Sequence, residues 1–592
     1  MKKNTILVLG VAELNCYFSL HPMDASESNI IALTTNVLNE AIVRGWQNVR
    51  MPEWILDKAT YNYEFNQKLV RKLTDLERES SIRRAVIGGT RMCAWNYYFN
   101  TTFLQQMRAS IELAGYLTGH LSGFEELLIL ATANPADYFF DSFLQPAAMQ
   151  HVLLKSGISC KLLMMDCQES VPTYIKDAYQ CLPNLRSGRL QDQWSGGVGA
   201  RIIMSPAAVF RRADKQKVDL ILKSFREELV PAFGSMEFLA FPFPFKFWQH
   251  FKDSEFFNEQ ITAIQALECL SPSLRESVQQ YVHWLTNATK SIYLEVLELA
   301  GFGESELFKA QISRVNDRHM WQCLNFVGLL ELFRKKPVHA SIVSIIDGGV
   351  NGPIQSAVME TSGELFCTPH SHIVNWPTDT ECSVLTEWWT PHESVPLLGG
   401  INNTYYLEDN WQSADARKGG VSPGRLLFLY NGVHDSVYSL ASMAYIKSVV
   451  EWITDLAGKY GCDVAHRLKP FDQTPHRAYC DILGLDVSRC ELTLKSSVAQ
   501  NASESDLVIA IDEPSTALWE VLSQGCPVLL IADREFTSAS VSDGDILCPV
   551  SFQLAKITLM QWFMDPSKFN EYRTLQLNKY KNKKISRLGA AN

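Results

Sequence analysis

"SDLVIAIDEPSTALWEVLSQGCPVLLIAD", residues 505–533, contains the pattern that decides the fold. An apolar run over 505–511 is followed by Ser515 and Thr516, which open a segment with helical spacing. That segment stops at a glycine, and a second apolar run begins at Pro527. Short apolar runs separated by helical segments are typical of parallel sheets built from β-α-β units. The stretch therefore predicts two strands of a parallel sheet joined by a helix.

The same alternation recurs towards both ends of the chain. Residues 215–335 are expected to form a helical insert, and a segment rich in Gly, Ser and Pro near 415–425 predicts a linker. We predict an α/β protein with an N-terminal domain over 1–420, a C-terminal doubly wound domain over 421–570 and a basic tail over 571–592. Strands are expected at 5–10, 84–89, 126–132, 160–166, 200–205, 340–349, 363–369, 425–432, 462–470, 490–494, 505–511 and 527–533.

Composition narrows the class of protein. The 592 residues are 46% hydrophobic and 20% charged, with a formal net charge of −10, which disfavours a dedicated nucleic-acid binder. The fourteen cysteines show no metal-ligand spacing, so we expect reduced thiols and no metal site. No apolar run reaches the roughly 18 residues of a membrane span. We expect a cytoplasmic protein that is at most peripheral to the inner membrane.

The end of the chain departs from this acidic balance. Basic residues gather there with few acids between them, at Arg573, Lys579, Lys581, Lys583, Lys584 and Arg587. Such a cluster is suited to anionic lipid headgroups, and the alternative is a solvated, fraying terminus.

Ser515 and Thr516 stand where a strand leads into a helix. In open parallel sheets, ligands bind beyond the carboxyl ends of the strands, and the start of a helix favours anions. The two hydroxyls add donors for phosphate oxygens. Glu520 lies four residues after Thr516 and can face the same ligand, where it would accept hydrogen bonds from ribose hydroxyls. The alternative is an ordinary helix cap with a solvated glutamate.

Residues 505–531 resemble the nucleotide-sugar site of GT-B glycosyltransferases, particularly the bacterial enzymes of capsule and lipopolysaccharide assembly. In that group a strand leads into Ser-Ser/Thr, then a helix with a glutamate, then Gly-x-Pro-Val. The resemblance implies two Rossmann-like doubly wound domains that face a cleft, with the helical insert in the first. It also implies phosphate contacts from Ser515 and Thr516 and a ribose contact from Glu520.

A second segment, "AHRLKPFD" (465–472), is similar to the Lys-Pro-His-Pro segment of transferases that use CMP-sugars, such as sialyl- and Kdo transferases. Lys469 matches that lysine, whereas Phe471 stands where the family has histidine. Either His466 takes the role of that histidine, or the donor differs. Asn431 and Gly432 follow the first strand of the C-terminal domain and are expected beside the nucleotide.

The remaining candidates lie in the N-terminal domain. Asp347, in "IIDGGVNGPIQS" (345–356), is similar in setting to the Asp/Glu-Gly motif that carries the catalytic carboxylate of sialyltransferases. It would act as a general base or as a nucleophile, and the competing interpretation is a capping Asp in a tight turn. We assign His370 to the catalytic site. The acceptor site is expected to include His372, Asn134 and Asp141.

These features favour a GT-B glycosyltransferase that needs neither metal nor cofactor. Its expected donor is CMP-Kdo or another CMP-nonulosonic acid, with UDP-, GDP- and CDP-linked donors left open. Its expected acceptor is an oligosaccharide or lipid-linked glycan of a bacterial surface polysaccharide. The alternatives are a CDP-polyol phosphotransferase of teichoic-acid-like polymer synthesis, a nucleotide-sugar epimerase, and a non-catalytic scaffold for capsule assembly.

Overall fold

The computed structural model divides the chain into two compact units. Unit 1 comprises Met1–Tyr61, Gln105–Glu169 and Asn410–Ala590, and unit 2 comprises Asn62–Leu104, Ser170–Asp409 and the last two residues. The residues that the structure describes are 5–21, 28–33, 35–52, 72, 75, 107, 110–120, 127–132, 146–165, 200–204, 236–240, 257–260, 267–296, 306–343, 351–367, 382–386, 401–406, 422–430, 443–468, 477–511, 517–533 and 546–590.

Unit 1 begins with a five-stranded parallel sheet in the order β3-β2-β1-β4-β5. Successive residues along its strands face opposite sides, and both sides are covered. Leu7 packs with Leu153 of α8, whereas Ile6 and Val8 pack with Leu14 of α1. The elements are β1 (Thr5–Val8), α1 (Val11–Leu20), β2 (Asn29–Ala32), α3 (Thr35–Val43), β3 (Val49–Arg50), β4 (Leu127–Thr132), α8 (Pro146–Lys155) and β5 (Cys160–Met165).

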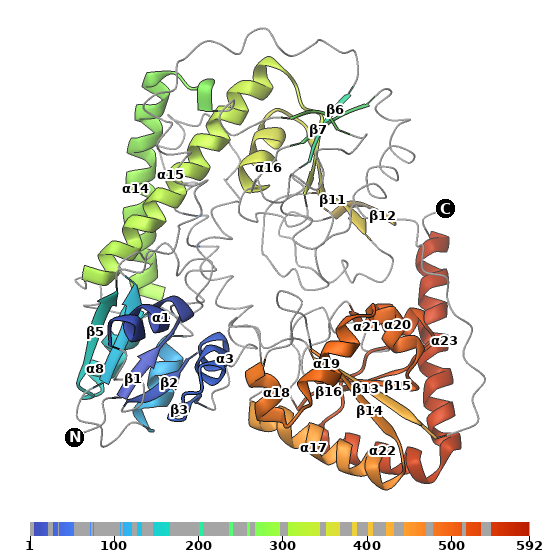
Figure 1. Ribbon diagram of the computed structural model, residues 1–592. Coiled ribbons are helices and arrows are strands. Elements are labelled where there is room, and N and C mark those ends of the chain that lie inside the picture. Colours follow the sequence, from blue (N-terminus) through green and yellow to red (C-terminus); the bar gives the residue numbers. More distant parts are fainter. Residues whose placement is uncertain are drawn as a thin grey trace. The chain divides into compact units, whose positions relative to one another are not determined.

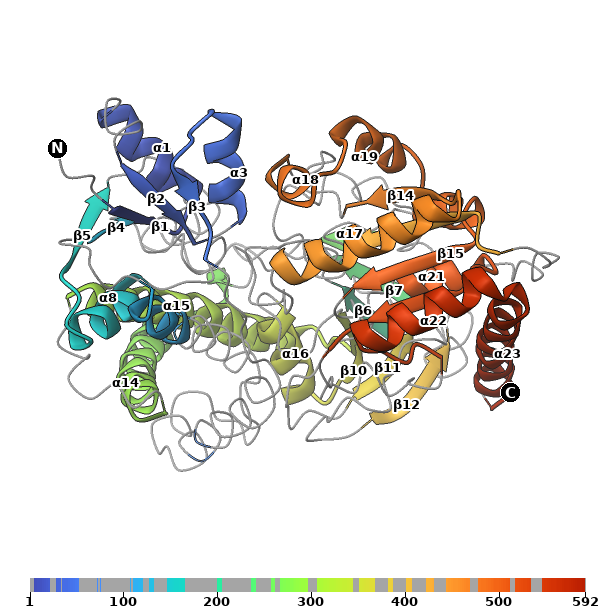
Figure 2. The same ribbon diagram turned by 90° about the horizontal axis from the view of Figure 1, so that it is seen from below.

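The second sheet of unit 1 has four parallel strands in the order β14-β13-β15-β16. All five residues of β15 are buried, as expected for a parallel strand with helices on both faces. Figure 2 shows α17 and α22 along one face of this sheet. Its strands are β13 (Arg425–Tyr430), β14 (Asp463–Arg467), β15 (Leu507–Ile511) and β16 (Val528–Ile531). Its helices are α17 (Met443–Lys459), α18 (Arg477–Leu483), α19 (Val487–Leu494), α20 (Val498–Ser503), α21 (Ala517–Ser523), α22 (Phe552–Met564) and α23 (Pro566–Ala590).

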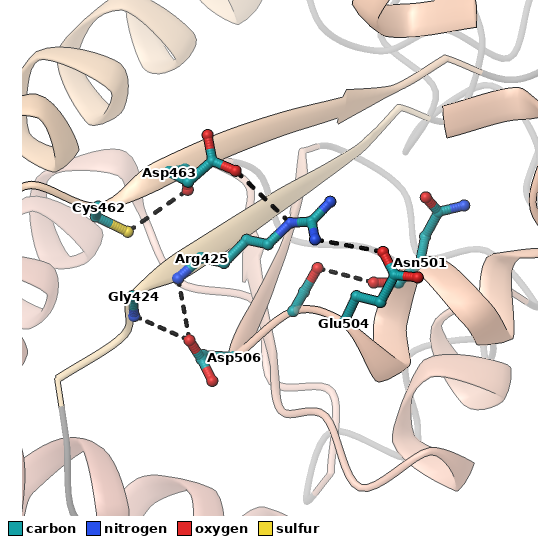
Figure 3. Close-up of polar contacts among 8 residues, drawn as sticks. Gly424, Arg425, Cys462, Asp463, Asn501, Glu504 and Asp506 are labelled. Atoms are coloured by element: carbon teal, nitrogen blue, oxygen red, sulfur yellow. Dashed lines mark hydrogen bonds and ion pairs between the residues drawn. The ribbon is translucent and has the colours of Figure 1, made fainter. Parts of the chain in front are cut away.

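A polar cluster closes the amino edge of this sheet (Figure 3). Asp506 Oδ2 accepts hydrogen bonds from the backbone N–H groups of Gly424 (2.9 Å) and Arg425 (3.0 Å). Arg425 in turn pairs with Glu504 (3.3 Å) and lies 3.8 Å from a carboxylate oxygen of Asp463. These ion pairs are partly exposed and contribute little stability. The Asp506 hydrogen bonds add to the backbone ladder that pairs β13 with β15.

Helix α23 closes the free edge of the same sheet. Gln576, which is 5% exposed, accepts a hydrogen bond from Val528 N (2.8 Å). Its amide nitrogen donates to Val528 O (2.9 Å) and Ile546 O (2.8 Å). An unpaired edge strand presents N–H and C=O groups that invite association with other strands. The glutamine side chain therefore pairs the start of β16. The backbone of Val550 pairs its end, where Val550 N donates to Leu530 O and Ala532 N donates to Val550 O (both 2.9 Å).

Unit 2 contains a seven-stranded parallel sheet in the order β12-β11-β10-β9-β6-β7-β8. Helices α14 and α15 form a long antiparallel pair (Figure 1), and their apolar side chains share a core with Ile203 of β6 and Ile354 of α16. The elements are β6 (Ala200–Met204), β7 (Met236–Ala240), β8 (Phe257–Gln260), α14 (Pro272–Val296), α15 (Glu306–Lys335), β9 (Ala340–Val343), α16 (Asn351–Glu360), β10 (Glu364–Cys367), β11 (Cys382–Thr386) and β12 (Ile401–Tyr406).

Polar side chains are buried between α14 and α15. His319 is fully buried, and its Nδ1 lies 3.4 Å from Thr286 Oγ1. The Thr286 hydroxyl also donates to Asn316 Oδ1 (3.2 Å). Burial disfavours the imidazolium and lowers the pKa of His319 to about 3, so this side chain is neutral at neutral pH.

Most of the expected strands are confirmed, and the α/β class with them. The strand expected at 490–494 is wrong, because these residues end α19. Asp486 caps that helix by accepting a hydrogen bond from Ser488 N (2.9 Å). The C-terminal sheet therefore has four strands rather than five. The strand expected at 84–89 lies outside the described residues.

Two broader expectations also need correction. The helical insert expected over 215–335 is wrong in part, because β7 and β8 lie within it and belong to the seven-stranded sheet. The chain forms three parallel sheets, whereas we expected two sheet domains. Hydrophobic runs predict that strands exist, but they do not specify which strands pair. Within the described residues, no helix combines the length and the apolar character needed to cross a bilayer.

Candidate functional site

The carboxyl edge of the four-stranded sheet is the region to which the predicted nucleotide contacts belong. Its parallel strands end there at Tyr430, Arg467, Ile511 and Ile531. The segments that follow these ends include 431–442, 469–476, 512–516 and 534–545, which lie outside the described residues. Asn431, Gly432, Lys469, Ser515 and Thr516 fall in these segments, so five predicted contacts follow three adjacent strand ends.

Glu520 is described, and it lies one turn into α21. Its Oε1 accepts a hydrogen bond from the backbone N–H of Ala499 (3.0 Å), in the first turn of α20. Burial raises the pKa of Glu520, while the Ala499 hydrogen bond and the positive charge of Arg467 act in the opposite direction. Glu520, the residue expected to contact ribose, therefore uses one of its two carboxylate oxygens to hold the start of α20. Among the described residues, Oε2 accepts no hydrogen bond.

Arg467, the last residue of β14, strengthens the same corner. Its guanidinium donates to Ser496 O (2.8 Å) and to Thr493 O. Both carbonyls belong to the end of α19 and the connection into α20. Burial lowers the pKa of Arg467, and Glu520 partly compensates. The hydrogen bonds of Arg467 and Glu520 thus hold the α19–α20 connection from two sides.

His466 lies among aromatic rings. Its Nδ1 lies 2.8 Å from the Tyr430 hydroxyl, and its ring is nearly parallel to Phe428 at 5.2 Å between centroids. Burial, and then the charge of Arg489, lower the pKa of His466 to about 4. Burial also raises the pKa of Tyr430 well above its usual range. The imidazole is therefore neutral at neutral pH and packs against Phe428 and Tyr430 of the neighbouring strand, which does not suit an ionic contact with phosphate.

Sequence reasoning did not identify Tyr430 as the partner of His466, or Ala499 as the partner of Glu520. The first pair is recoverable in principle, because Tyr430 ends β13 and His466 lies one residue before the end of the adjacent strand β14. The second pair joins residues 21 positions apart on two different helices. No local sequence pattern indicates how these helices pack.

The candidates of the N-terminal part lie outside the described residues. In the chain, Asp347 follows the carboxyl end of β9 by four residues, and His370 follows that of β10 by three. These strands are parallel neighbours in the seven-stranded sheet. His372 follows β10 as well, whereas Asn134 and Asp141 follow β4 of the five-stranded sheet.

The described part of the chain contains no group of three or more His, Cys, Asp or Glu side chains arranged to hold a metal ion. No protein-family model matches the sequence, and no curated protein matches it. One solved structure with weak similarity is described as an adenylation, ketoreductase and pseudo Asub multidomain structure of a keto acid-selecting NRPS module. It is 9% identical with a TM-score of 0.13, over 80% of this chain and 43% of that chain. The chain thus spans less than half of that module.

Proposed function

We propose that this protein is a glycosyltransferase of the GT-B type that transfers a sugar from a nucleotide-activated donor to a bacterial surface polysaccharide or its lipid-linked precursor. The donor we favour is CMP-Kdo or another CMP-nonulosonic acid. One observation carries the proposal: adjacent parallel strand ends of one sheet lead directly into the segments that contain Asn431, Lys469, Ser515 and Thr516.

The strand orders support a nucleotide site at this edge. The four-stranded order β14-β13-β15-β16 reverses direction between β13 and β15. In open α/β sheets, ligands bind outside the carboxyl ends of the strands at such a reversal. Asn431 follows β13, and Ser515 follows β15, so these candidates flank the reversal in chain order. The five- and seven-stranded sheets reverse in the same way, between β1 and β4 and between β6 and β9. A doubly wound GT-B arrangement is part of the proposal.

The proposed roles follow from side-chain chemistry. Ser515 and Thr516 donate hydrogen bonds to the donor phosphate, and Glu520 accepts one from ribose through Oε2. Because α21 has only seven residues, the hydroxyls rather than the helix dipole carry most of the phosphate contact. Asp347 takes the proton of the acceptor hydroxyl as its oxygen attacks the anomeric carbon, and the nucleotide leaves with the electron pair of the broken bond.

The test combines nucleotide binding with donor turnover. CMP, CDP, UDP and GDP are added singly to the full chain, and thermal unfolding is recorded. A nucleotide at 100 times its Kd stabilises the native state by about 2.7 kcal/mol. CMP should stabilise most. The double variant Ser515→Ala/Thr516→Ala should lose this effect, whereas Thr574→Ala/Ser586→Ala, at exposed positions of α23, should retain it.

Donor consumption separates an enzyme from a scaffold in the same preparation. Asp347→Asn should keep nucleotide binding and lose release of CMP from a CMP-sugar by at least 100-fold, because a general base contributes about that much. Absence of stabilisation by all four nucleotides would reject the proposed site. If the wild type binds nucleotide normally but does not consume the donor in the presence of acceptor glycans, the protein is a nucleotide-binding scaffold and not a transferase.

A further inference from the structure

Two buried cysteines meet where α18 leads into α19. Cys480 lies in the middle of α18 and Cys490 lies in α19, and Figure 2 shows these two helices next to each other. Both side chains belong to the core of the four-stranded sheet and are at most 1% exposed. Both are free thiols, and the Cys480 thiol donates a hydrogen bond to Cys490 Sγ. The two sulfur atoms are therefore in direct contact.

The connection between the two helices is short and well defined. It comprises residues 484–486, and Gly484 has a φ of 67°, a left-handed conformation that favours glycine. The Leu485 N–H donates to Cys480 O (2.8 Å), and Asp486 caps α19. The sulfur atoms of a disulfide lie about 2.05 Å apart, so sulfurs in hydrogen-bonding contact need to approach by only about 2 Å. A small movement of α18 towards α19 supplies this approach.

The hydrogen bond makes the two thiols chemically unequal. It lowers the pKa of Cys490, against the effect of burial, and together with burial it raises the pKa of Cys480. The thiolate is the nucleophilic form of cysteine, so Cys490 is expected to react first. Because both side chains are buried, the suitable oxidant is a molecule as small as hydrogen peroxide, which enters when α18 opens locally.

We propose that Cys480 and Cys490 form a reversible disulfide in response to hydrogen peroxide, and that this bond locks α18 onto α19. The Cys490 thiolate attacks one peroxide oxygen, the O–O bond breaks, and the departing hydroxide takes up the thiol proton to leave as water. The Cys480 sulfur then attacks the sulfur of the resulting sulfenic acid. The S–S bond forms, the S–O bond breaks, and the Cys480 proton leaves with the oxygen as a second water. Two electrons pass from the thiols to the peroxide, and a small dithiol reverses the change.

The position of α18 extends the effect of this bond beyond the two helices. Ile482 of α18 packs against the core of the five-stranded sheet. Tyr479 of α18 contacts Tyr430, the last residue of β13, edge-on at 5.6 Å between ring centroids. A covalent link from α18 to α19 therefore stiffens the helix through which the two sheets of unit 1 are in contact.

Peptide mapping of the full chain tests the disulfide. The reduced protein is treated with hydrogen peroxide, the remaining thiols are alkylated, and the digest is analysed by mass spectrometry without reduction. We expect a pair of peptides cross-linked through Cys480 and Cys490, which dithiothreitol separates. Cys480→Ala and Cys490→Ala should abolish this product. The matched control, Cys462→Ala, changes a buried cysteine of the same core and should retain it.

Amide hydrogen exchange tests whether the bond locks α18. Exchange of the Leu485 N–H should slow at least tenfold on oxidation, because the link restricts opening of the connection in which this group is bonded to Cys480 O. The wild type and Cys462→Ala should show this effect, and Cys480→Ala and Cys490→Ala should not. Thermal unfolding of the reduced proteins shows whether each variant is folded, and the wild-type map is decisive if an alanine variant is not.

Three results would overturn the proposal. The first is oxidation of other cysteines without the Cys480–Cys490 cross-link. The second is a cross-link that forms only in urea, which would make the pair a part of the core that is inert in the native state. The third is a cross-link that leaves exchange at Leu485 unchanged, which would show that the bond does not lock α18. Because no nucleotide is present, this test is independent of the proposed transferase activity.

Discussion

At the residue scale, Glu520 combines a structural contact with a candidate binding role. Oε1 accepts a hydrogen bond from the N–H of Ala499, and the positive charge of Arg467 acts to lower the pKa of the carboxyl. A side chain fixed in this way loses little conformational freedom when it binds a ligand, which favours affinity. The hydrogen bond to Ala499 and the proposed ribose contact use different oxygens of the Glu520 carboxylate. A substitution that keeps only one acceptor oxygen therefore separates the two contacts.

Substitutions of Glu520 should lower the free energy of unfolding by an amount that depends on whether the hydrogen bond to Ala499 is kept. Glu520→Ala leaves the half-buried Ala499 N–H without its acceptor and should lower the free energy of unfolding by about 1–3 kcal/mol. Glu520→Gln retains an acceptor oxygen and should cost less. Urea unfolding followed by circular dichroism measures both. Equal losses for the two variants would show that the charge, and not the hydrogen bond to Ala499, stabilises this corner.

At the scale of elements, α23 is tied to the sheet by polar side chains as well as by apolar packing. The Tyr572 hydroxyl donates to Val528 O (2.5 Å). Gln576 makes three hydrogen bonds to Val528 and Ile546, and Phe569, Leu577 and Tyr580 are buried alongside it. A segment expected from its charge to be a tail is thus an integral helix of unit 1.

Gln576 should be the most sensitive position of α23. Gln576→Leu removes these three hydrogen bonds, and Val528 N and Ile546 O lose this partner while Tyr572 still donates to Val528 O. We therefore expect a loss of about 2–4 kcal/mol in the free energy of unfolding. Asn578→Leu, at an exposed position of the same helix, should change it by less than about 0.5 kcal/mol. Chemical denaturation measures both. A small effect of Gln576→Leu would mean that apolar packing and the Tyr572 hydrogen bond hold α23.

The elements also show which features a sequence predicts. Apolar runs such as 505–511 and 527–533 indicate strands because both faces of a parallel sheet are buried. Strands were missed at β2, β3, β7, β8, β11 and β12, because runs of two to six residues in a mixed context resemble helix or loop. Chain order predicts which candidates follow strand ends. The contact between Glu520 and Ala499 depends on helix packing, which no local pattern encodes.

At the scale of the whole molecule, each unit contains a histidine that is held neutral by burial. His466 belongs to unit 1, where burial lowers its pKa to about 4, and His319 belongs to unit 2, where burial lowers its pKa to about 3. An unfolded histidine titrates near 6.5. Between these values the unfolded chain binds more protons than the native chain, so acid favours unfolding.

The contribution of the two neutral histidines to the free energy of unfolding should therefore be fully present above about pH 6.5. It should fall as the pH is lowered towards 4, by up to about 1.4 kcal/mol per pH unit for each histidine. His319→Gln should reduce this slope for the unfolding of unit 2, and His466→Gln should do so for unit 1, even if each variant is less stable at pH 7.5. His283→Gln, at an exposed position of α14, is the matched control and should leave both slopes unchanged. Urea unfolding at half-unit intervals from pH 7.5 to 4.5 provides the slopes. If His319→Gln and His466→Gln keep the wild-type slopes, carboxylates rather than buried histidines govern the response to acid, because only the histidine contribution is removed by these substitutions.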